Sequence, residues 1–246
     1  MTASALSAIA GTAVRYLLQS IVDLPADDAW LAPIERARLA QLRIAKRRAD
    51  WRLGRWTAKQ AVAAALDVAP DRVAVIATAG GAPLALLDGL PAPLAISLSH
   101  AAGRGLCAVA PAGTAIGCDL EVVAERGPAF AADYCTAAER AWIGADARSV
   151  TLAWSAKEAV LKALGEGLRE DPRAVEVTLE AGRSGAWAAL SAAQSPERPD
   201  PGATSTARGS SRRPSPSAFS TASFADQARV TERASAPIHA RSAAVQ

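Results

Sequence analysis

Three acidic side chains in the second half of the chain have the chemistry of a metal site. Residues 115–123, AIGCDLEVV, alternate apolar and polar side chains, which predicts a strand with Asp119 and Glu121 on one face. Two carboxylates side by side are unfavourable unless a cation lies between them. Mg²⁺ prefers oxygen ligands of this kind and completes its shell with water and phosphate oxygens. Glu158, in a separate predicted helix, is a third candidate ligand.

The segment that holds Glu158 also has a simpler interpretation. Residues 154–162, WSAKEAVLK, have the pattern of an amphipathic helix in which Trp154 and Leu161 face the core. A glutamate four residues before a lysine, as Glu158 and Lys162 are, stabilises an exposed helix by roughly 0.2–0.5 kcal/mol. The segment by itself does not choose between an exposed ion pair and a binding site.

A strongly basic segment lies in the first half of the chain. Residues 36–59 contain nine Lys or Arg side chains and one acid, Asp50, in a proline-free stretch that predicts one helix, or two helices joined near Gly54. Four of these cations are spaced to form one stripe: Arg48, Arg52, Arg55 and Lys59. The stripe is either a solvated face or a site for an anionic partner, and the mutual repulsion of nine cations favours the partner.

The composition excludes several classes of protein. The 246 residues carry a net charge of +3, but residues 1–190 hold 20 basic and 20 acidic side chains, so the body has no overall attraction for nucleic acid or for an anionic membrane. Three cysteines without CxxC spacing predict reduced thiols, with no disulfide framework and no zinc site. We therefore expect a cytoplasmic protein that binds neither nucleic acid nor membrane.

The segments between these motifs predict an α+β fold. Residues 94–99 and 105–110 read as a β-hairpin, and 72–78 as a strand before it. Helices are predicted over 129–135, over 136–145 with Thr136 as N-cap and Glu139 in a capping box, and over 149–167 with a glycine C-cap. Residues 174–180 and 185–190 predict two more strands.

Three short blocks resemble the signature of one enzyme family. SLSH at 97–100, GCDLE at 117–121 and WSAKEAVLKALGEGL at 154–168 are similar to blocks of the 4′-phosphopantetheinyl transferases. Their order and spacing resemble the long, single-chain type that activates nonribosomal peptide and polyketide synthases. RRADWRLGRWTAK at 47–59 resembles the basic coenzyme A helix of that type, so the resemblance covers roughly residues 35–190.

The resemblance implies transfer of 4′-phosphopantetheine from coenzyme A to a serine of an acyl or peptidyl carrier protein, with release of adenosine 3′,5′-bisphosphate. Asp119, Glu121 and Glu158 would hold Mg²⁺ against the pyrophosphate. Glu158, or a metal-bound water near it, would remove the serine proton, while Lys162 stabilises phosphate oxygens. Lys157 would lie close to the same phosphates.

The resemblance also implies contacts to coenzyme A from the first half. Ser99 and His100 fall in the block that contacts coenzyme A phosphate, and Arg48, Arg52 and Arg55 are candidates for the 3′-phosphate. The implied fold is a monomeric pseudo-dimer of two similar α/β halves with the active site between them. The N-terminal half would cover residues 1–112 and the C-terminal half residues 113–190.

Residues 191–246 predict a disordered tail outside the catalytic fold. They contain eleven Ser and six Pro, a composition that buries too little apolar surface to offset chain entropy. Deletion after Leu190 is expected to leave activity unchanged. Two other functions stay open for the whole chain, namely an Mg²⁺-dependent phosphohydrolase and a nucleic-acid-binding module that uses the arginine-rich helix.

Overall fold

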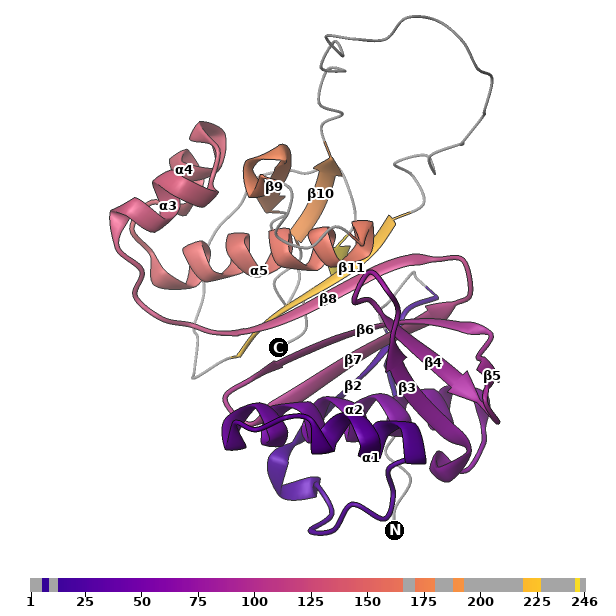
Figure 1. Ribbon diagram of the computed structural model, residues 1–246. Coiled ribbons are helices and arrows are strands. Elements are labelled where there is room, and N and C mark those ends of the chain that lie inside the picture. Colours follow the sequence, from indigo (N-terminus) through magenta and orange to yellow (C-terminus); the bar gives the residue numbers. More distant parts are fainter. Residues whose placement is uncertain are drawn as a thin grey trace, which may run out of the picture.

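The structure is a computed structural model that describes residues 6–8, 13–165, 171–179, 188–192, 219–226 and 242–243 (Figure 1). Within these residues the chain forms five α-helices and several small sheets, which confirms the predicted mixture of the two. The helices are α1 (Pro33–Ala40), α2 (Ala45–Leu66), α3 (Pro128–Tyr134), α4 (Ala137–Ile143) and α5 (Ala147–Leu164). The strands are β1 (Ser7–Ala8), β2 (Arg15–Ser20), β3 (Val73–Ala77), β4 (Pro83–Leu87), β5 (Leu90–Pro91), β6 (Leu94–Ala101), β7 (Arg104–Pro111), β8 (Ala115–Val122), β9 (Val175–Leu179), β10 (Ala188–Ala192), β11 (Phe219–Asp226) and β12 (Ser242–Ala243).

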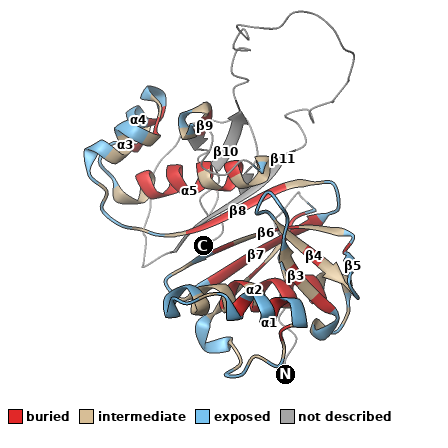
Figure 2. Ribbon diagram, in the orientation of Figure 1, coloured by how far each residue is buried: buried red, intermediate tan, exposed pale blue. Residues whose placement is uncertain are grey.

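The first part of the chain packs helix α2 on an antiparallel sheet. The sheet has the strand order β1-β2-β7-β6, and the predicted hairpin is the β6–β7 pair, in which Ser97 lies opposite Ala108. One core joins α2, this sheet and the β3–β4 pair, and it includes Ala58, Val62, Val75 and Cys107. Buried residues follow α2 and β7 in Figure 2, so the basic helix is anchored through its apolar stripe.

Strand β8 packs on the other face of this sheet. Ile116, Cys118 and Leu120 join residues of β7 in a second core, whereas the alternate residues of β8 face helix α5. The predicted alternation of residues 115–122 is therefore confirmed. The resulting order of layers is α2, the four-stranded sheet, β8 and α5 (Figure 1).

Helix α5 lies unusually close to β8 at Gly117. A Cβ atom built on Gly117 would lie 1.7 Å from the carbonyl oxygen of Ala159 and 2.8 Å from the amide nitrogen of Ala163. Only a residue without a side chain allows this contact between helix and strand backbones. Gly117 thus fixes the distance between the acidic face of β8 and the helix that carries Glu158.

Helix boundaries follow local capping chemistry. Thr136 caps α4 as predicted, because its hydroxyl accepts from the Glu139 amide at 3.1 Å while the Glu139 carboxylate accepts from the Thr136 amide at 2.7 Å. Helix α5 ends at Gly165, whose φ of 76° is the left-handed conformation of a glycine C-cap.

Two predictions about chain organisation need correction. The break in the basic segment falls between α1 and α2, over residues 41–44, and Gly54 lies inside the continuous helix α2.

In the region predicted as a disordered tail, residues 219–226 form β11, which pairs in parallel with β8 from Ala115 to Val122. The physical reason is the free edge of β8, since an unpaired strand edge offers a row of amide and carbonyl groups to another strand. Most of the remaining tail lies outside the described residues.

No helix among the described residues is long and apolar enough to cross a membrane.

The contact at Gly117 gives the first prediction. We expect Gly117→Ala to lower the free energy of unfolding by about 1–3 kcal/mol or more, because the added methyl group has to push the α5 backbone away. Urea unfolding followed by circular dichroism measures this loss. The matched control is Gly54→Ala, which adds the same group to a helix position where no atom outside the adjoining helix backbone lies within 4 Å. Equal stability of the two variants would contradict the close contact.

Candidate functional site

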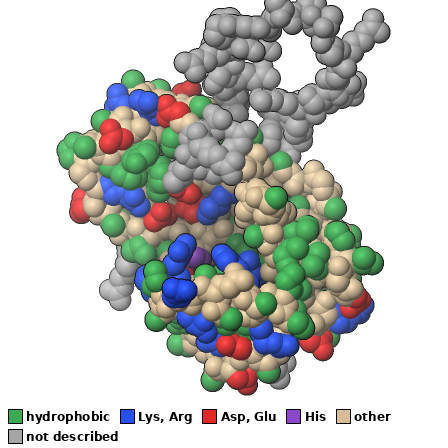
Figure 3. Space-filling view, viewed as in Figure 1, with side chains coloured by type: hydrophobic (Ala, Val, Ile, Leu, Met, Phe, Trp, Pro, Cys, Tyr) green, Lys and Arg blue, Asp and Glu red, His purple; other side chains and the backbone are tan. Residues whose placement is uncertain are grey.

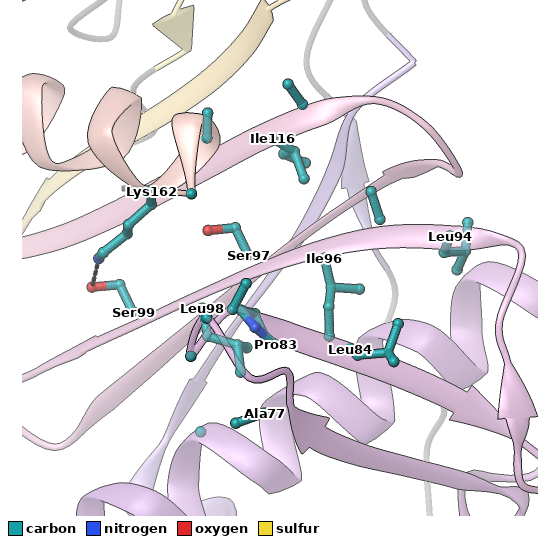
Figure 4. A pocket seen from close by; sticks show the side chains of 18 of the residues that line it. Ala77, Pro83, Leu84, Leu94, Ile96, Ser97, Leu98, Ser99, Ile116 and Lys162 are labelled. Carbon is teal, nitrogen blue, oxygen red and sulfur yellow. Dashed lines mark hydrogen bonds between the residues drawn. The ribbon is translucent and has the colours of Figure 1, made fainter. Parts of the chain in front are cut away.

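A cavity of about 950 Å³ opens where the two parts of the molecule meet (Figure 4). Helix α2, strand β6, the β3–β4 turn and the end of α5 line it. Its charged and polar lining residues are Asp50, Arg55, Ser97, Ser99, His100, Thr114 and Lys162. One region of the wall is apolar, with Leu84, Leu94 and Ile96 drawn together in Figure 4. The cavity therefore combines a polar wall with an apolar one.

Lys162, Asp119 and Ser99 form a connected cluster at the polar wall. Lys162 Nζ lies 2.7 Å from Asp119 Oδ1 and donates to Ser99 Oγ at 3.2 Å (Figure 4) and to the Cys118 carbonyl at 3.1 Å. The Ser99 hydroxyl donates to the same Asp119 oxygen at 2.9 Å. Burial is the largest single effect and lowers the pKa of Lys162, but the charge and hydrogen bond of Asp119, together with the charges of Cys118 and Glu158, outweigh it, so the pKa lies above its ordinary value. The ammonium group is thus held charged beside the cavity.

Two serine hydroxyls join β6 to β8. The amide of Cys118 donates to Ser97 Oγ at 3.0 Å, and the amide of Leu120 donates to Ser99 Oγ at 3.1 Å. These alternate amides of β8 are satisfied by side chains, so β6 approaches β8 without a backbone ladder between them. Ser99, predicted as a cofactor-binding residue, thereby also positions Asp119.

Glu121 and Glu158 lie beside Asp119 in a partly buried acidic group. Burial raises the pKa of Glu158, and the neighbouring charge of Asp119 raises it further. Burial and then Asp119 likewise raise the pKa of Glu121, against the opposing effect of Arg126 and of the Trp154 indole. The structure therefore brings the three predicted metal ligands into one electrostatic environment.

The donor chemistry of this group fits Mg²⁺. The second carboxylate oxygen of Asp119, Oδ2, is buried and has no hydrogen-bond partner in the described residues. A buried acceptor of this kind is costly unless a donor or cation satisfies it. No three His, Cys, Asp or Glu side chains of the described ranges close around a common point. Mg²⁺ tolerates this, because it is usually held by one or two carboxylates together with water and substrate phosphates.

The structure separates the predicted arginines of the basic stripe. Arg48 donates to the carbonyl oxygens of Leu39 at 2.7 Å and Leu42 at 3.3 Å, which secures the end of α1. Arg52 donates to the carbonyls of residues 25–27 and pairs with Asp28 at 2.7 Å. Neither guanidinium group lines the cavity.

Arg55 and His100 do line the cavity, on the side of the N-terminal part. The Arg55 guanidinium lies over the Trp51 ring at 4.8 Å from its centroid. Burial lowers the pKa of Arg55, and the charge of Glu35 opposes this. His100 is exposed at the end of β6. Figure 3 shows Lys and Arg side chains gathered beside a histidine, across a hollow from acidic side chains.

Lys157 has a different place from the one predicted. Its side chain is 0% exposed and pairs with Glu139, also 0% exposed, at 2.8 Å. It further donates to the carbonyl oxygens of Val175 and of Pro172. The structure does not bring Lys157 to the cavity but uses it to tie α5 to α4 and β9.

The same buried pair occurs in the first part of the chain. Lys59 of α2 pairs with Glu35 of α1 at 3.2 Å, and both side chains are 1% exposed. The Glu35 carboxylate accepts from the amide of Val75, just as Glu139 accepts from the amide of Val177. The sequences around the two lysines, WTAKQAVAAAL at 56–66 and WSAKEAVLKAL at 154–164, agree at seven of eleven positions.

This repeat was missed in the sequence, although its signal was present. The shared Trp, Ala, Lys, Ala, Val, Ala and Leu were each visible, but an alanine-rich composition makes such matches common by chance. Asp50, Trp51 and Gly54 were likewise missed as cavity-lining residues, because the sequence of α2 does not show which elements form the other walls of the cavity.

Comparison with known proteins finds a family model that matches the second part of the chain. Residues 115–197 match the family model described as the 4′-phosphopantetheinyl transferase superfamily. This confirms the superfamily predicted from the sequence blocks, and the long, single-chain type stays a prediction. No curated protein matches the chain.

Among solved structures, the chain is similar to holo-[acyl-carrier-protein] synthase from Helicobacter pylori, determined in complex with coenzyme A. The sequence identity is 16% and the TM-score 0.31, and the match covers 40% of this chain and 99% of that one.

The two buried pairs give the second prediction. We expect Lys157→Met and Lys59→Met each to lower the free energy of unfolding by about 3–5 kcal/mol, because each variant leaves a buried carboxylate without its cation. Urea unfolding measures both losses. The matched control is Lys46→Met, whose lysine is 84% exposed in its pair with Asp50. A Lys157→Met variant with wild-type stability would contradict the anchoring role.

Proposed function

We propose that this chain, whose residues 115–197 match the model of the 4′-phosphopantetheinyl transferase superfamily, transfers 4′-phosphopantetheine from coenzyme A to a serine of an acyl or peptidyl carrier protein. The observation that carries the proposal is that basic side chains from both parts of the chain line one cavity, beside the carboxylate of Asp119. Arg55 and His100 come to it from the N-terminal part, and Lys162 comes from the C-terminal part beside Asp119. A pyrophosphate needs both cations for its oxygens and carboxylates for its metal.

In the proposed reaction the serine hydroxyl oxygen of the carrier protein attacks the β-phosphorus of coenzyme A. A new phosphorus–oxygen bond forms to serine while the bond from this phosphorus to the bridging pyrophosphate oxygen breaks. The serine proton passes to a base, and adenosine 3′,5′-bisphosphate leaves with the bond's electron pair. Lys162, whose three N–H groups contact Asp119, Ser99 and the Cys118 carbonyl, would place its positive charge beside the phosphate oxygens on which charge develops.

Asp119, Glu121 and Glu158 are the proposed ligands of Mg²⁺. When bound, the ion makes the phosphorus more electrophilic and offsets charge on the leaving group. Asp119 is the best supported of the three, since its Oδ2 is buried without a hydrogen-bond partner in the described part of the chain while its Oδ1 is already held by Lys162 and Ser99. Glu158, or a water molecule held beside it, is the proposed base that removes the serine proton.

We further propose that the two halves are related copies with a single site between them. The repeated Lys–Glu pairs and the repeated segment of α2 and α5 support this. At the position of Glu158 the first copy has Gln60, and at the position of Lys162 it has Ala64. Only the second copy therefore carries the acid and the cation of the proposed chemistry.

The transfer itself gives the third prediction. Mass spectrometry of a carrier protein incubated with coenzyme A and Mg²⁺ should show an increment of about 340 Da, the mass of the group transferred. We expect Asp119→Asn and Glu158→Gln to lower the rate by 10²–10³-fold, because each removes charge that acts in the transition state. The exposed acid Asp133 of α3 offers the control variant Asp133→Asn.

Two outcomes would contradict the proposal. Near wild-type modification by both acid variants at saturating Mg²⁺ would remove the metal assignment. Release of adenosine 3′,5′-bisphosphate in the absence of any carrier protein would favour a phosphohydrolase instead.

The fourth prediction follows from the different positions of the arginines, since Arg55 lines the cavity and Arg48 does not. If Arg55 binds the 3′-phosphate, the Michaelis constant for dephospho-coenzyme A should exceed that for coenzyme A, and Arg55→Gln should bring the ratio of the two constants close to one. Steady-state kinetics with both substrates measures the ratio. Arg48→Gln is the control, because Arg48 contacts backbone carbonyls away from the cavity. A ratio unchanged by Arg55→Gln would remove this residue from the phosphate site.

A further inference from the structure

Both oxygens of the Glu121 carboxylate are held by groups from outside its strand. The indole Nε1 of Trp154 donates to Oε1 at 3.1 Å, and Arg126 Nη2 lies 3.3 Å from Oε2. Trp154 comes from α5, one turn before Glu158, so it links one proposed metal ligand to the helix that carries another. Each carboxylate oxygen can accept a further interaction, because it has two lone pairs.

An aromatic cluster fixes the donor of this hydrogen bond. Trp154 packs edge-on against Phe130 with ring centroids 5.3 Å apart and against Tyr134 at 4.8 Å. The guanidinium of Arg126 lies over Phe130 at 4.4 Å from the ring centroid. Trp154 and Arg126, which hold Glu121, thus both pack against aromatic side chains of α3, and this packing restricts their movement.

The first copy of the repeat supplies a comparison within the same molecule. Trp56 occupies the position of Trp154 and is also buried against an aromatic neighbour, with its ring 5.1 Å from that of Trp30. Its Nε1 is buried and has no hydrogen-bond partner among the described residues. Burial of the tryptophan ring is therefore common to both copies, whereas the indole N–H contact to a carboxylate is made by Trp154, in the copy that carries Glu158.

We propose that Trp154 is a positioning residue for the magnesium site, whose indole N–H holds the Glu121 carboxylate in one orientation through the hydrogen bond to Oε1. This inference rests on the proposed function. Groups that orient a metal ligand in this way alter metal affinity 10–100-fold when they are removed. Trp154 contributes through a neutral donor, so it orients the carboxylate without competing for its charge as a cation does.

The test uses Mn²⁺ as the probe, with free Mn²⁺ followed by electron paramagnetic resonance at saturating coenzyme A. Trp154→Phe keeps an aromatic ring against Phe130 and Tyr134 but removes the N–H donor. We expect it to weaken Mn²⁺ binding by about tenfold or more. Trp56→Phe, the same change in the first copy, should leave Mn²⁺ affinity within twofold of wild type.

A double variant separates orientation from packing. In a Glu121→Ala background, which removes the acceptor, Trp154→Phe should cause no further loss of Mn²⁺ affinity, because the two residues act through one hydrogen bond. In activity assays the Mg²⁺ concentration for half-maximal rate should rise in Trp154→Phe, while the rate at saturating Mg²⁺ stays within about threefold of wild type.

The outcomes are distinguishable. Wild-type Mn²⁺ affinity in Trp154→Phe, or losses that add in the double variant, would overturn the positioning role while leaving the proposed function intact. If the wild-type protein binds no Mn²⁺ and Glu121→Ala behaves identically, the metal assignment falls and this inference falls with it.

Discussion

The close approach of α5 to β8 at Gly117 determines where the charged groups of the site lie. Because the Ala159 backbone occupies the space of a missing side chain, the acids of β8 and the helix that carries Glu158 and Lys162 are held at short range. Like charges at this distance repel one another, and Lys162 offsets part of the repulsion through its ion pair with Asp119. The raised pKa values of Glu121 and Glu158 come first from burial and then from the neighbouring charge of Asp119.

The buried Lys–Glu pairs explain how such a contact persists. Each pair joins a long helix to the short helix before it, and its glutamate also satisfies a strand amide after it. A buried pair of this kind adds little net stability by itself, but breaking it is costly. Its effect is to specify one arrangement of three elements, and the chain uses it once in each half. In the second half Glu158 directly follows the anchored Lys157, so the position of the proposed base is fixed by its neighbour.

Local patterns in the sequence predicted the elements and the acidic cluster well. The alternation of residues 115–122 places Asp119 and Glu121 correctly, and the caps at Thr136 and Gly165 are where capping chemistry requires them. The contacts of individual Arg and Lys side chains could not be predicted, because residue type does not reveal which carbonyl or carboxylate a side chain will contact. Arg48 and Arg52 contact carbonyls, and Lys157 is buried, although each resembles Arg55 or Lys162 in sequence. The β8–β11 pairing was not predicted for a related reason. It joins segments about a hundred residues apart, and the edge of β8 with which β11 pairs exists only in the folded protein.

The two oxygens of Asp119 have different surroundings. Lys162 and Ser99 both engage Oδ1, which fixes the carboxylate and leaves Oδ2 buried without a hydrogen-bond partner in the described part of the chain. If Lys162 alone neutralised the acidic group, its ammonium would be expected between the carboxylates, yet its remaining contacts go to Ser99 and the Cys118 carbonyl. The arrangement instead places the lysine on the cavity side of Asp119. In the proposed function, the lysine and the metal ion would therefore bind separate oxygens of Asp119.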